Sequence, residues 1–341
     1  MKTLRLHVVA AAARRHPPRT QGPSPKTWSP PPITLDCPHF DVCAGCTLSH
    51  DLNNPPTLHA ARAYFARYQR TLQLNEIQQR HGWRQRARLA VRGHTHDVII
   101  GLFRAASHDA MAIPDCRVHN SLINRAVERL KKHINVLGIQ PYDEATHTGQ
   151  LRYLQLTIVD CEVDVENDGC NYSTRAVQAV VVWNRNSSLP LDPALQQLTK
   201  AISADPDSTL CTLWVNYQPL PTNVIMGPVS TLLWVRLTSV LFSPLISILR
   251  HHVQHHGKDT AVTGDSNLVY ARHQAPQGER DVWRTFGGAR VFLGPASFVQ
   301  ANMQAMDAAL AAMQRWVQPK STVVDLHAGV GTIGTMPSGS S

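Results

Sequence analysis

Three cysteines near the start of the chain have the spacing of ligands to a single metal centre. Cys37, Cys43 and Cys46 form a C-x5-C-x2-C pattern, and a C-x2-C pair is typical of metal-binding thiolates. Gly45 lies between the last two cysteines and lets the backbone turn sharply enough for neighbouring thiolates to converge. The segment therefore predicts three of the ligands of an iron–sulfur cluster or of a structural zinc ion.

A complete site of either kind needs a fourth ligand. Cys116 is the candidate, because the proline-containing turn IPDC (residues 113–116) can bring a distant thiolate back to the first three. His39 and His50 are further candidate ligands if the metal is zinc. The residues alone leave zinc and [4Fe–4S] as alternatives, with buried thiols that bind no metal as a third.

A second group of residues has the pattern of a nucleotide-like cofactor site. Residues 321–334 read STVVDLHAGVGTIG, in which an apolar strand (322–326) runs into a glycine-containing loop. In doubly wound sheets such a loop receives ligands at the carboxyl end of the strand. Gly329 and Gly331 allow the backbone to approach the ligand closely, and the loop amides can bind its carboxylate.

Arginines are concentrated between residues 62 and 92, where eight of them accompany a single acid, Glu76. Three aromatic residues are interleaved with them: Tyr64, Tyr68 and Trp83. Arginine supplies forked donors for phosphates and a flat face for unstacked bases, so this stretch is the candidate RNA-binding region. The candidate contacts are Arg84, Arg86, Arg88 and Arg92. The alternative is a solvated helix face followed by an edge strand.

These residues require a mixed α+β framework to position them. Hydrophobic periodicity predicts helices over residues 57–74, 121–137 and 195–202. Alternation predicts strands over residues 86–92, 98–103, 151–159, 177–183 and 211–217. A last helix opens after residue 293 and runs to about Trp316, with Ser297 as its candidate N-cap. The first helix is expected to have one apolar face, made of Leu58, Ala61, Phe65, Tyr68 and Leu72.

One apolar stretch, residues 228–256, does not fit this framework. It is nearly long enough to span a membrane, but Arg236 and Pro244 interrupt it, and we expect no membrane span. A buried amphipathic helix or an insertion is expected instead. Three further cysteines lie in strand-like or turn-like contexts and are expected to be structural thiols: Cys161, Cys170 and Cys211.

Length and composition bound the class of protein. The chain has 341 residues, 43% hydrophobic and 17% charged, which excludes wholesale disorder and permits about two domains. Seven cysteines are too few for a disulfide-dense secreted scaffold. Residues 1–34 hold six basic residues and no acid, which accounts for much of the net charge of +9. This composition is typical of an organelle transit peptide, with a disordered tail as the alternative.

Four motifs together resemble the uracil-5 RNA methyltransferase family, in particular its iron–sulfur members of plant and algal plastid type. They are CPHFDVCAGCTLSH (37–50), IPDC (113–116), LGPASFVQAN (293–302) and DLHAGVGTIG (325–334). The resemblance implies two cofactors, S-adenosyl-L-methionine (SAM) and a [4Fe–4S] cluster, and rRNA or tRNA rather than DNA as the partner. By position it implies the cluster ligands Cys37, Cys43, Cys46 and Cys116, and the SAM contacts Gln300, Asp325, His327, Gly329, Gly331 and Thr332. His327 and Ala328 depart from the family pattern, which has an aromatic residue and often a cysteine there.

The implied architecture has three parts. A transit peptide or disordered tail (1–34) precedes an α+β iron–sulfur and RNA-binding central domain (35–294). Residues 295–341 then give the first elements of an α/β Rossmann-like SAM-dependent methyltransferase domain, which is expected to be incomplete. No residue matches the nucleophilic cysteine or the general base of the family, so no catalytic residue is assigned.

The resemblance implies a SAM-dependent enzyme that forms 5-methyluridine in rRNA or tRNA, of which these residues are expected to lack the catalytic half. The alternative is an iron–sulfur RNA-binding protein without catalysis. A monomer is expected, located in the plastid or alternatively in the mitochondrion, with no membrane as partner.

Overall fold

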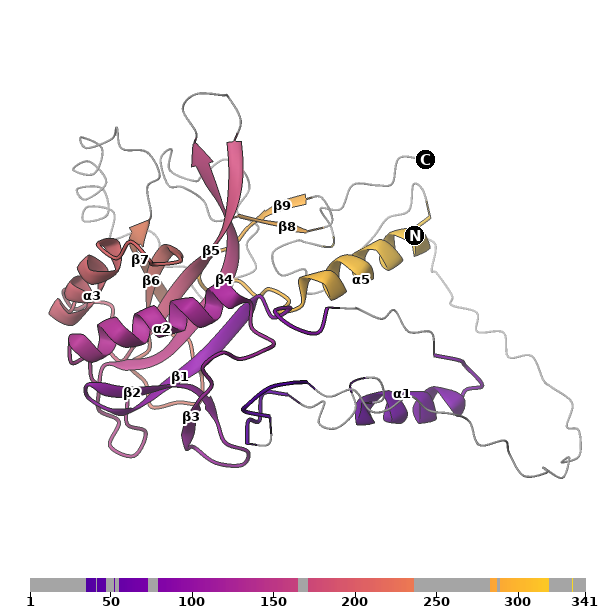
Figure 1. Ribbon diagram of the computed structural model, residues 1–341, viewed down its shortest axis with the longest axis horizontal. Helices are drawn as coiled ribbons and strands as arrows, with labels where there is room; N and C mark the ends of the chain where they lie inside the picture. The colour runs from indigo at the N-terminus through magenta and orange to yellow at the C-terminus, as the bar shows by residue number, and fades with distance from the viewer. Residues whose placement is uncertain are drawn as a thin grey trace, which may run out of the picture.

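The computed structural model describes residues 35–40, 42–46, 52, 55–72, 79–164, 171–235, 283–286, 289–318 and 333. Its centre is a mixed β-sheet with the strand order β3-β2-β1-β4-β5-β6-β7, and the hairpin β8–β9 pairs with β4 (Figure 1). The strands are β1 (Arg86–His94), β2 (Asp97–Phe103), β3 (Ala110–Ala112), β4 (Leu151–Asp164), β5 (Asn171–Trp183), β6 (Leu210–Tyr217), β7 (Val229–Val235), β8 (Trp283–Phe286) and β9 (Ala289–Phe292). The helices are α1 (Pro56–Ala66), α2 (Ser121–Val136), α3 (Pro193–Ser203) and α5 (Met303–Trp316).

Connection lengths explain the direction of each strand pair. Short connections leave β1–β2 and β4–β5 antiparallel, whereas β5 and β6 are parallel because α3 carries the chain back between them. The β1–β2 turn joins the opposed residues His94 and Asp97. Gly93, just before it, has φ +95, and a Cβ there would lie 2.8 Å from the carbonyl oxygen of Asp97, so only glycine fits.

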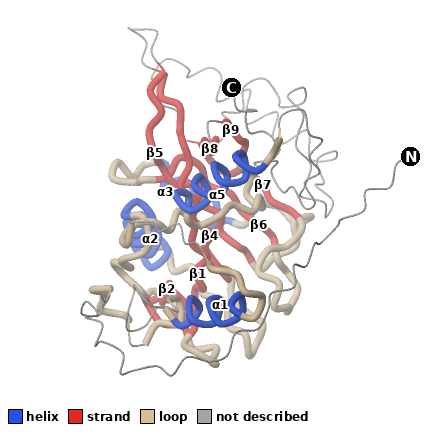
Figure 2. The backbone as a smooth tube through the Cα atoms, turned by 90° about the vertical axis from the view of Figure 1, so that its right-hand side faces the viewer, coloured by secondary structure: helices blue, strands red, loops and turns tan. Residues whose placement is uncertain are grey.

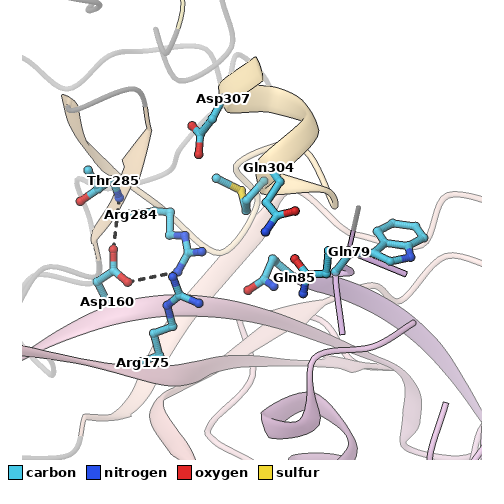
Figure 3. Close-up of a pocket in the computed structure, with 10 residues that line it drawn as sticks. Gln79, Gln85, Asp160, Arg175, Arg284, Thr285, Gln304 and Asp307 are labelled. Atoms are coloured by element: carbon cyan, nitrogen blue, oxygen red, sulfur yellow. Dashed lines mark hydrogen bonds and ion pairs between the residues drawn. The ribbon is translucent and has the colours of Figure 1, made fainter. Parts of the chain in front are cut away.

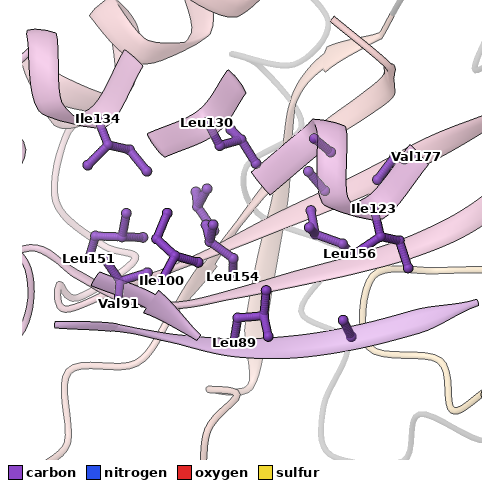
Figure 4. Close-up of a cluster of buried hydrophobic side chains, with 14 of the residues drawn as sticks. Leu89, Val91, Ile100, Ile123, Leu130, Ile134, Leu151, Leu154, Leu156 and Val177 are labelled. Carbon is purple, nitrogen blue, oxygen red and sulfur yellow. The ribbon is translucent and has the colours of Figure 1, made fainter. Parts of the chain in front are cut away.

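The main core lies between the sheet and helix α2. This helix packs on β2, β4 and β5, and α3 packs beside it (Figures 1 and 2). Figure 4 shows Ile123, Leu130 and Ile134 of α2 above Leu154 and Leu156 of β4, and all five are almost completely buried. Their spacing on α2 is the three-to-four residue repeat that predicted the helix, and burial of this stripe is the main force holding α2 in place.

A second, smaller core joins the hairpin β8–β9 and helix α5 to the sheet. Its buried members are Val159, Phe286, Val291, Leu293, Val299, Met303 and Leu310. Helix α5 is capped by Asn302, whose side-chain oxygen accepts a hydrogen bond from the amide of Ala305 at 3.0 Å. The expectation that Ser297 caps this helix is therefore wrong: Ser297 lies in a turn, where its amide donates to the carbonyl of Gly294.

The elements predicted between residues 86 and 217 are confirmed, with β4 and β5 longer than expected. The helix predicted over 57–74 is confirmed only as far as Ala66, and it contains no buried residue. The side chains of Phe65 and Tyr68 are 39% and 61% exposed. The reason is that periodicity reports an apolar stripe, but it does not report whether another element covers that stripe.

The apolar stretch 228–256 also differs from expectation. Its first residues form strand β7, which pairs antiparallel with β6, and residues 236–256 lie outside the described residues. No helix in the described ranges is long and apolar enough to cross a membrane. Cys161 and Cys211, expected to be thiols, are joined in a disulfide, and Cys170 lies outside the described residues.

Candidate functional site

A buried glutamine forms the centre of a polar junction on the sheet. Gln155 of β4 is 1% exposed and lies directly opposite Arg88 of β1. Its Oε1 accepts hydrogen bonds from Arg86 Nη2 and from Arg88 Nε, both at 2.7 Å. Its Nε2 donates to the carbonyl oxygen of Pro295 at 2.7 Å. One side chain thus connects two strands to the segment that leads into α5.

That segment, residues 293–302, carries the LGPASFVQAN motif and is fastened to the sheet at several points. Gln178 Nε2 of β5 donates to the carbonyl oxygen of Leu293 at 3.0 Å. Arg86 Nη1 donates to the carbonyl oxygen of Ser297 at 2.6 Å. The backbone amide of Gln85 donates to the carbonyl oxygen of Ala301 at 2.7 Å. Buried side chains satisfy backbone carbonyls that have no strand partner, which gives the segment one fixed path.

Gln300, the first of the predicted SAM contacts, lies on this fastened segment and is exposed. The others lie outside the described residues: Asp325, His327, Gly329, Gly331 and Thr332. The structure therefore places one of the six predicted contacts, immediately before the start of α5 at Met303.

Two of the four predicted RNA-binding arginines are engaged inside the protein. Arg86 is 8% exposed, and burial, with the neighbouring charge of Arg88, lowers its pKa to about 10, so it stays protonated at neutral pH. Arg92 forms an ion pair with Glu144 and donates to the carbonyl oxygen of Arg152 at 2.8 Å. Burial raises the pKa of Glu144, but the hydrogen bond and charge of Arg92 outweigh burial and leave that pKa lowered.

The other two arginines face outward. Arg88 is exposed, although its Nε is bound to Gln155. Arg84 is half-buried, and its guanidinium carbon lies 5.0 Å from the centre of the Trp83 ring. A guanidinium held against an aromatic face keeps its N–H groups free for phosphate while it loses little side-chain entropy.

The four predicted cluster ligands are brought into one neighbourhood. The His39 ring donates to the carbonyl oxygen of Pro114 at 2.5 Å, and Arg117 Nε donates to that of Asp36 at 2.9 Å, so the segment 35–46 is attached to the turn that carries Cys116. Burial raises the pKa of the Cys46 thiol, and so do the other three predicted ligands, Cys116, Cys43 and Cys37 in decreasing order.

All four of these cysteines are free thiols. Among the residues that the structure describes, however, no three His, Cys, Asp or Glu side chains are arranged as ligands around one point. The donor type and number fit a four-cysteine metal centre, and the thiols interact electrostatically with one another.

Sequence reasoning missed Gln155 and Gln178. The available signal was the presence of glutamine at inward positions of otherwise apolar strands, because a buried amide is expected only where it has hydrogen-bond partners. The partners, Pro295 and Leu293, follow more than 100 residues later, which alternation within a strand does not reveal.

Comparisons with known proteins support the coarser part of the motif resemblance, similarity to RNA methyltransferases. No family model matches the chain. An uncharacterized RNA methyltransferase of Protochlamydia amoebophila is 31% identical over 305 residues, which cover 88% of this chain and 64% of the relative. An uncharacterized RNA methyltransferase of Geobacter sulfurreducens is 26% identical, and the match covers 89% of this chain and 51% of that relative. The chain thus spans between half and two thirds of the length of these curated relatives.

Among solved structures, a Pyrococcus abyssi tRNA (uracil-54, C5)-methyltransferase in complex with S-adenosyl-L-homocysteine matches with a TM-score of 0.55 and 18% identity. The match covers 90% of this chain and 56% of that chain, and at this identity it establishes the fold. The chain is therefore similar, along nearly nine-tenths of its length, to proteins named RNA methyltransferases, and it shares its fold with a tRNA (uracil-54, C5)-methyltransferase.

Proposed function

We propose that this protein is a SAM-dependent RNA methyltransferase that forms 5-methyluridine in rRNA or tRNA. The observation that carries the proposal is the junction of Gln155, Arg86 and Gln178, which fastens the 293–302 segment to the sheet. This arrangement holds Gln300 in a fixed exposed position at the start of α5. The similarity to the two bacterial relatives supports the same assignment.

SAM, when bound, supplies the methyl group. Gln300 is proposed to contact it from the fastened segment, together with the five loop residues that the motif resemblance names: Asp325, His327, Gly329, Gly331 and Thr332. A polar contact held by a rigid backbone loses little entropy on binding, which is the contribution of the junction to the reaction. We also propose a monomer located in the plastid, with the mitochondrion as the alternative.

The RNA-binding surface is proposed to include Arg84, Arg88 and helix α1. On α1 and just beyond it lie three exposed aromatic rings, and the ring of Tyr64 contacts those of Phe65 and Tyr68, with centroid distances of 5.3 and 5.4 Å. Exposed aromatic rings among arginines offer stacking faces and phosphate donors together. Arg86 and Arg92 serve this surface by holding β1 in place.

Cys37, Cys43, Cys46 and Cys116 are proposed to hold a [4Fe–4S] cluster. Such a cluster would fix the segment 35–46 against the turn 113–116. We expect protein purified without air to show thiolate-to-iron absorption, and Cys116→Ser to lose that absorption and the bound iron. The control variant Cys161→Ser/Cys211→Ser is expected to keep both. A colourless protein with one zinc ion per chain would replace the cluster with a zinc site.

The function is tested by incubating the protein with methyl-labelled SAM and unmodified rRNA or tRNA transcripts, then digesting the RNA to nucleosides. We expect the RNA to be bound, with weaker binding by Arg88→Ala. Label in 5-methyluridine would support the methyltransferase assignment and would overturn the expectation that these residues lack the nucleophile. RNA binding without any label would favour the non-catalytic alternative. A protein that binds neither RNA nor SAM would overturn both.

A further inference from the structure

A small cavity of about 200 Å³ lies where three distant parts of the chain meet. Its walls include Trp83 and Gln85, which precede β1. They also include Asp160 from β4, Arg175 from β5 and Arg284 from β8. Figure 3 shows Gln79, Gln85 and Gln304 on one side of it and the cluster of Asp160, Arg175 and Arg284 on the other. Nothing in the proposed SAM or cluster sites uses these side chains.

One wall carries a buried hydrogen-bond acceptor without a donor. Gln85 is 7% exposed, and its Nε2 donates to the carbonyl oxygen of Gly82 at 3.2 Å. Its Oε1 is buried and accepts no hydrogen bond from any described residue. A buried amide oxygen in this state is unfavourable unless a ligand supplies the donor, since nearly all such groups are paired in folded proteins.

The opposite wall carries two arginines and two aspartates, and Arg175 is the arginine that is exposed. Asp160 is already matched, because it accepts from Arg284 Nη1 at 3.1 Å and from the amide of Thr285 at 3.2 Å. Arg284 is 5% exposed, and burial lowers its pKa, to which the nearby positive charge of Arg175 adds. Arg175 itself is exposed at the rim, and Asp307 of α5 is the other acid in the wall. Arg175 is thus the cation of this wall that a phosphate at the rim can reach.

We propose that this cavity holds one unstacked base of the RNA, with an N–H of the base donating to Gln85 Oε1 and the adjoining phosphate against Arg175. The inference rests on the proposed function, which makes RNA the partner. The volume is below the roughly 300–1,000 Å³ typical of sites for whole small molecules, so it suits a base rather than a complete cofactor. Trp83 adds an aromatic wall, and splayed bases are recognised in RNA by such combinations of ring contact and edge hydrogen bonds.

The test measures binding of short single-stranded oligo(A), oligo(C) and oligo(U) to the whole protein by fluorescence anisotropy at several salt concentrations. Gln85→Met removes the acceptor while keeping the volume, and we expect it to weaken binding roughly three- to tenfold. Arg175→Ala is expected to reduce the slope of log K against log salt by about 0.7, the loss of one phosphate contact. The matched control is Arg125→Ala, an exposed arginine on α2, which is expected to leave both values unchanged.

The outcomes separate this inference from the function it rests on. If wild type binds the oligonucleotides and both pocket variants bind them equally well, the cavity holds no base and the proposed function stands. If wild type binds no RNA, both the inference about the cavity and the proposed function are overturned. Should Gln85→Met melt well below wild type, the exposed Arg175→Ala variant decides alone, because removing a rim side chain leaves the fold intact.

Discussion

Replacing Gln155 by leucine is expected to destabilise the protein by about 3–5 kcal/mol, because it removes a buried acceptor shared by two arginines. Gln155 is 1% exposed, and Arg86 beside it is 8% exposed, so water does not replace the lost bond. Of its two hydrogen bonds described above, the guanidinium of Arg86 would then retain only the one to the carbonyl oxygen of Ser297. The carbonyl of Pro295 would lose its donor at the same time. Urea unfolding of wild type and variant gives the difference in free energy.

The same substitution is expected to release the 293–302 segment, which limited proteolysis detects as faster cleavage near Gln300. The matched control is Gln197→Leu on the exposed side of α3, expected to change the free energy of unfolding by less than about 0.5 kcal/mol. If the free energy of unfolding of Gln155→Leu lies within about 1 kcal/mol of that of wild type, the junction does not stabilise this segment. The argument for a fixed Gln300 then fails.

Much of the central fold follows from local pattern. The β1–β2 hairpin was predicted because apolar alternation on both sides encloses a turn that needs glycine at Gly93. Helix α2 was predicted because apolar positions recur every three to four residues, as its buried residues Ile123, Ala126, Leu130 and Ile134 do. In both elements the burying surface is formed by strands of strong apolar character, so local and tertiary preferences agree.

Features that depend on distant parts of the chain were not predictable in this way. Tyr68, just beyond helix α1, was expected on an apolar helix face, yet it is 61% exposed, and none of the described strands or helices covers it. Within the sequence of β4, Gln155 is a polar residue in an apolar strand, and its hydrogen-bond acceptor, the carbonyl of Pro295, lies 140 residues later in the chain. The cavity at Gln85 is assembled from segments near residues 83, 160–175 and 284–304. Spacing within one element carries no information about such meetings.

The four cysteines are an intermediate case. Their spacing predicted a shared centre, and the structure brings Cys46 close enough to the other three for their charges to raise its pKa. The resemblance, rather than geometry, selects iron–sulfur over zinc, because thiolates bind both and the thiols are not arranged as ligands.

Replacing Asp205 by asparagine is expected to lower the free energy of unfolding at pH 7 by about 2 kcal/mol. This loss is smaller than that expected for a fully buried ion pair, because the side chain of Arg129 is 26% exposed and water partly screens its charge. Asp205 follows α3, and its side chain is 1% exposed. It accepts from Arg129 Nε at 2.8 Å and from His133 Nε2 at 2.9 Å, both one turn apart on α2. The carboxylate therefore holds the two helices of the main core together.

This contribution is expected to disappear in acid. The hydrogen bond from Arg129, above all, with that from His133, holds the pKa of Asp205 well below its usual range despite burial. A carboxyl whose pKa is lowered by folding stabilises the protein at pH values above its unfolded pKa of about 4, and that stability is lost as the pH falls further. The stability difference between wild type and Asp205→Asn is thus constant from pH 7 to about 5 and shrinks below about pH 4.

Urea unfolding at several pH values measures this difference directly. The control is Asp207→Asn, since Asp207 also faces Arg129, at 3.4 Å, but its side chain is 74% exposed. Its loss is expected to cost less than about 0.5 kcal/mol at any pH, because an exposed pair is screened by water and salt. If the two variants have the same stability at pH 7, the carboxylate of Asp205 is no more important than its exposed neighbour. A difference that grows below pH 4 would mean that Asp205 is protonated in the folded protein.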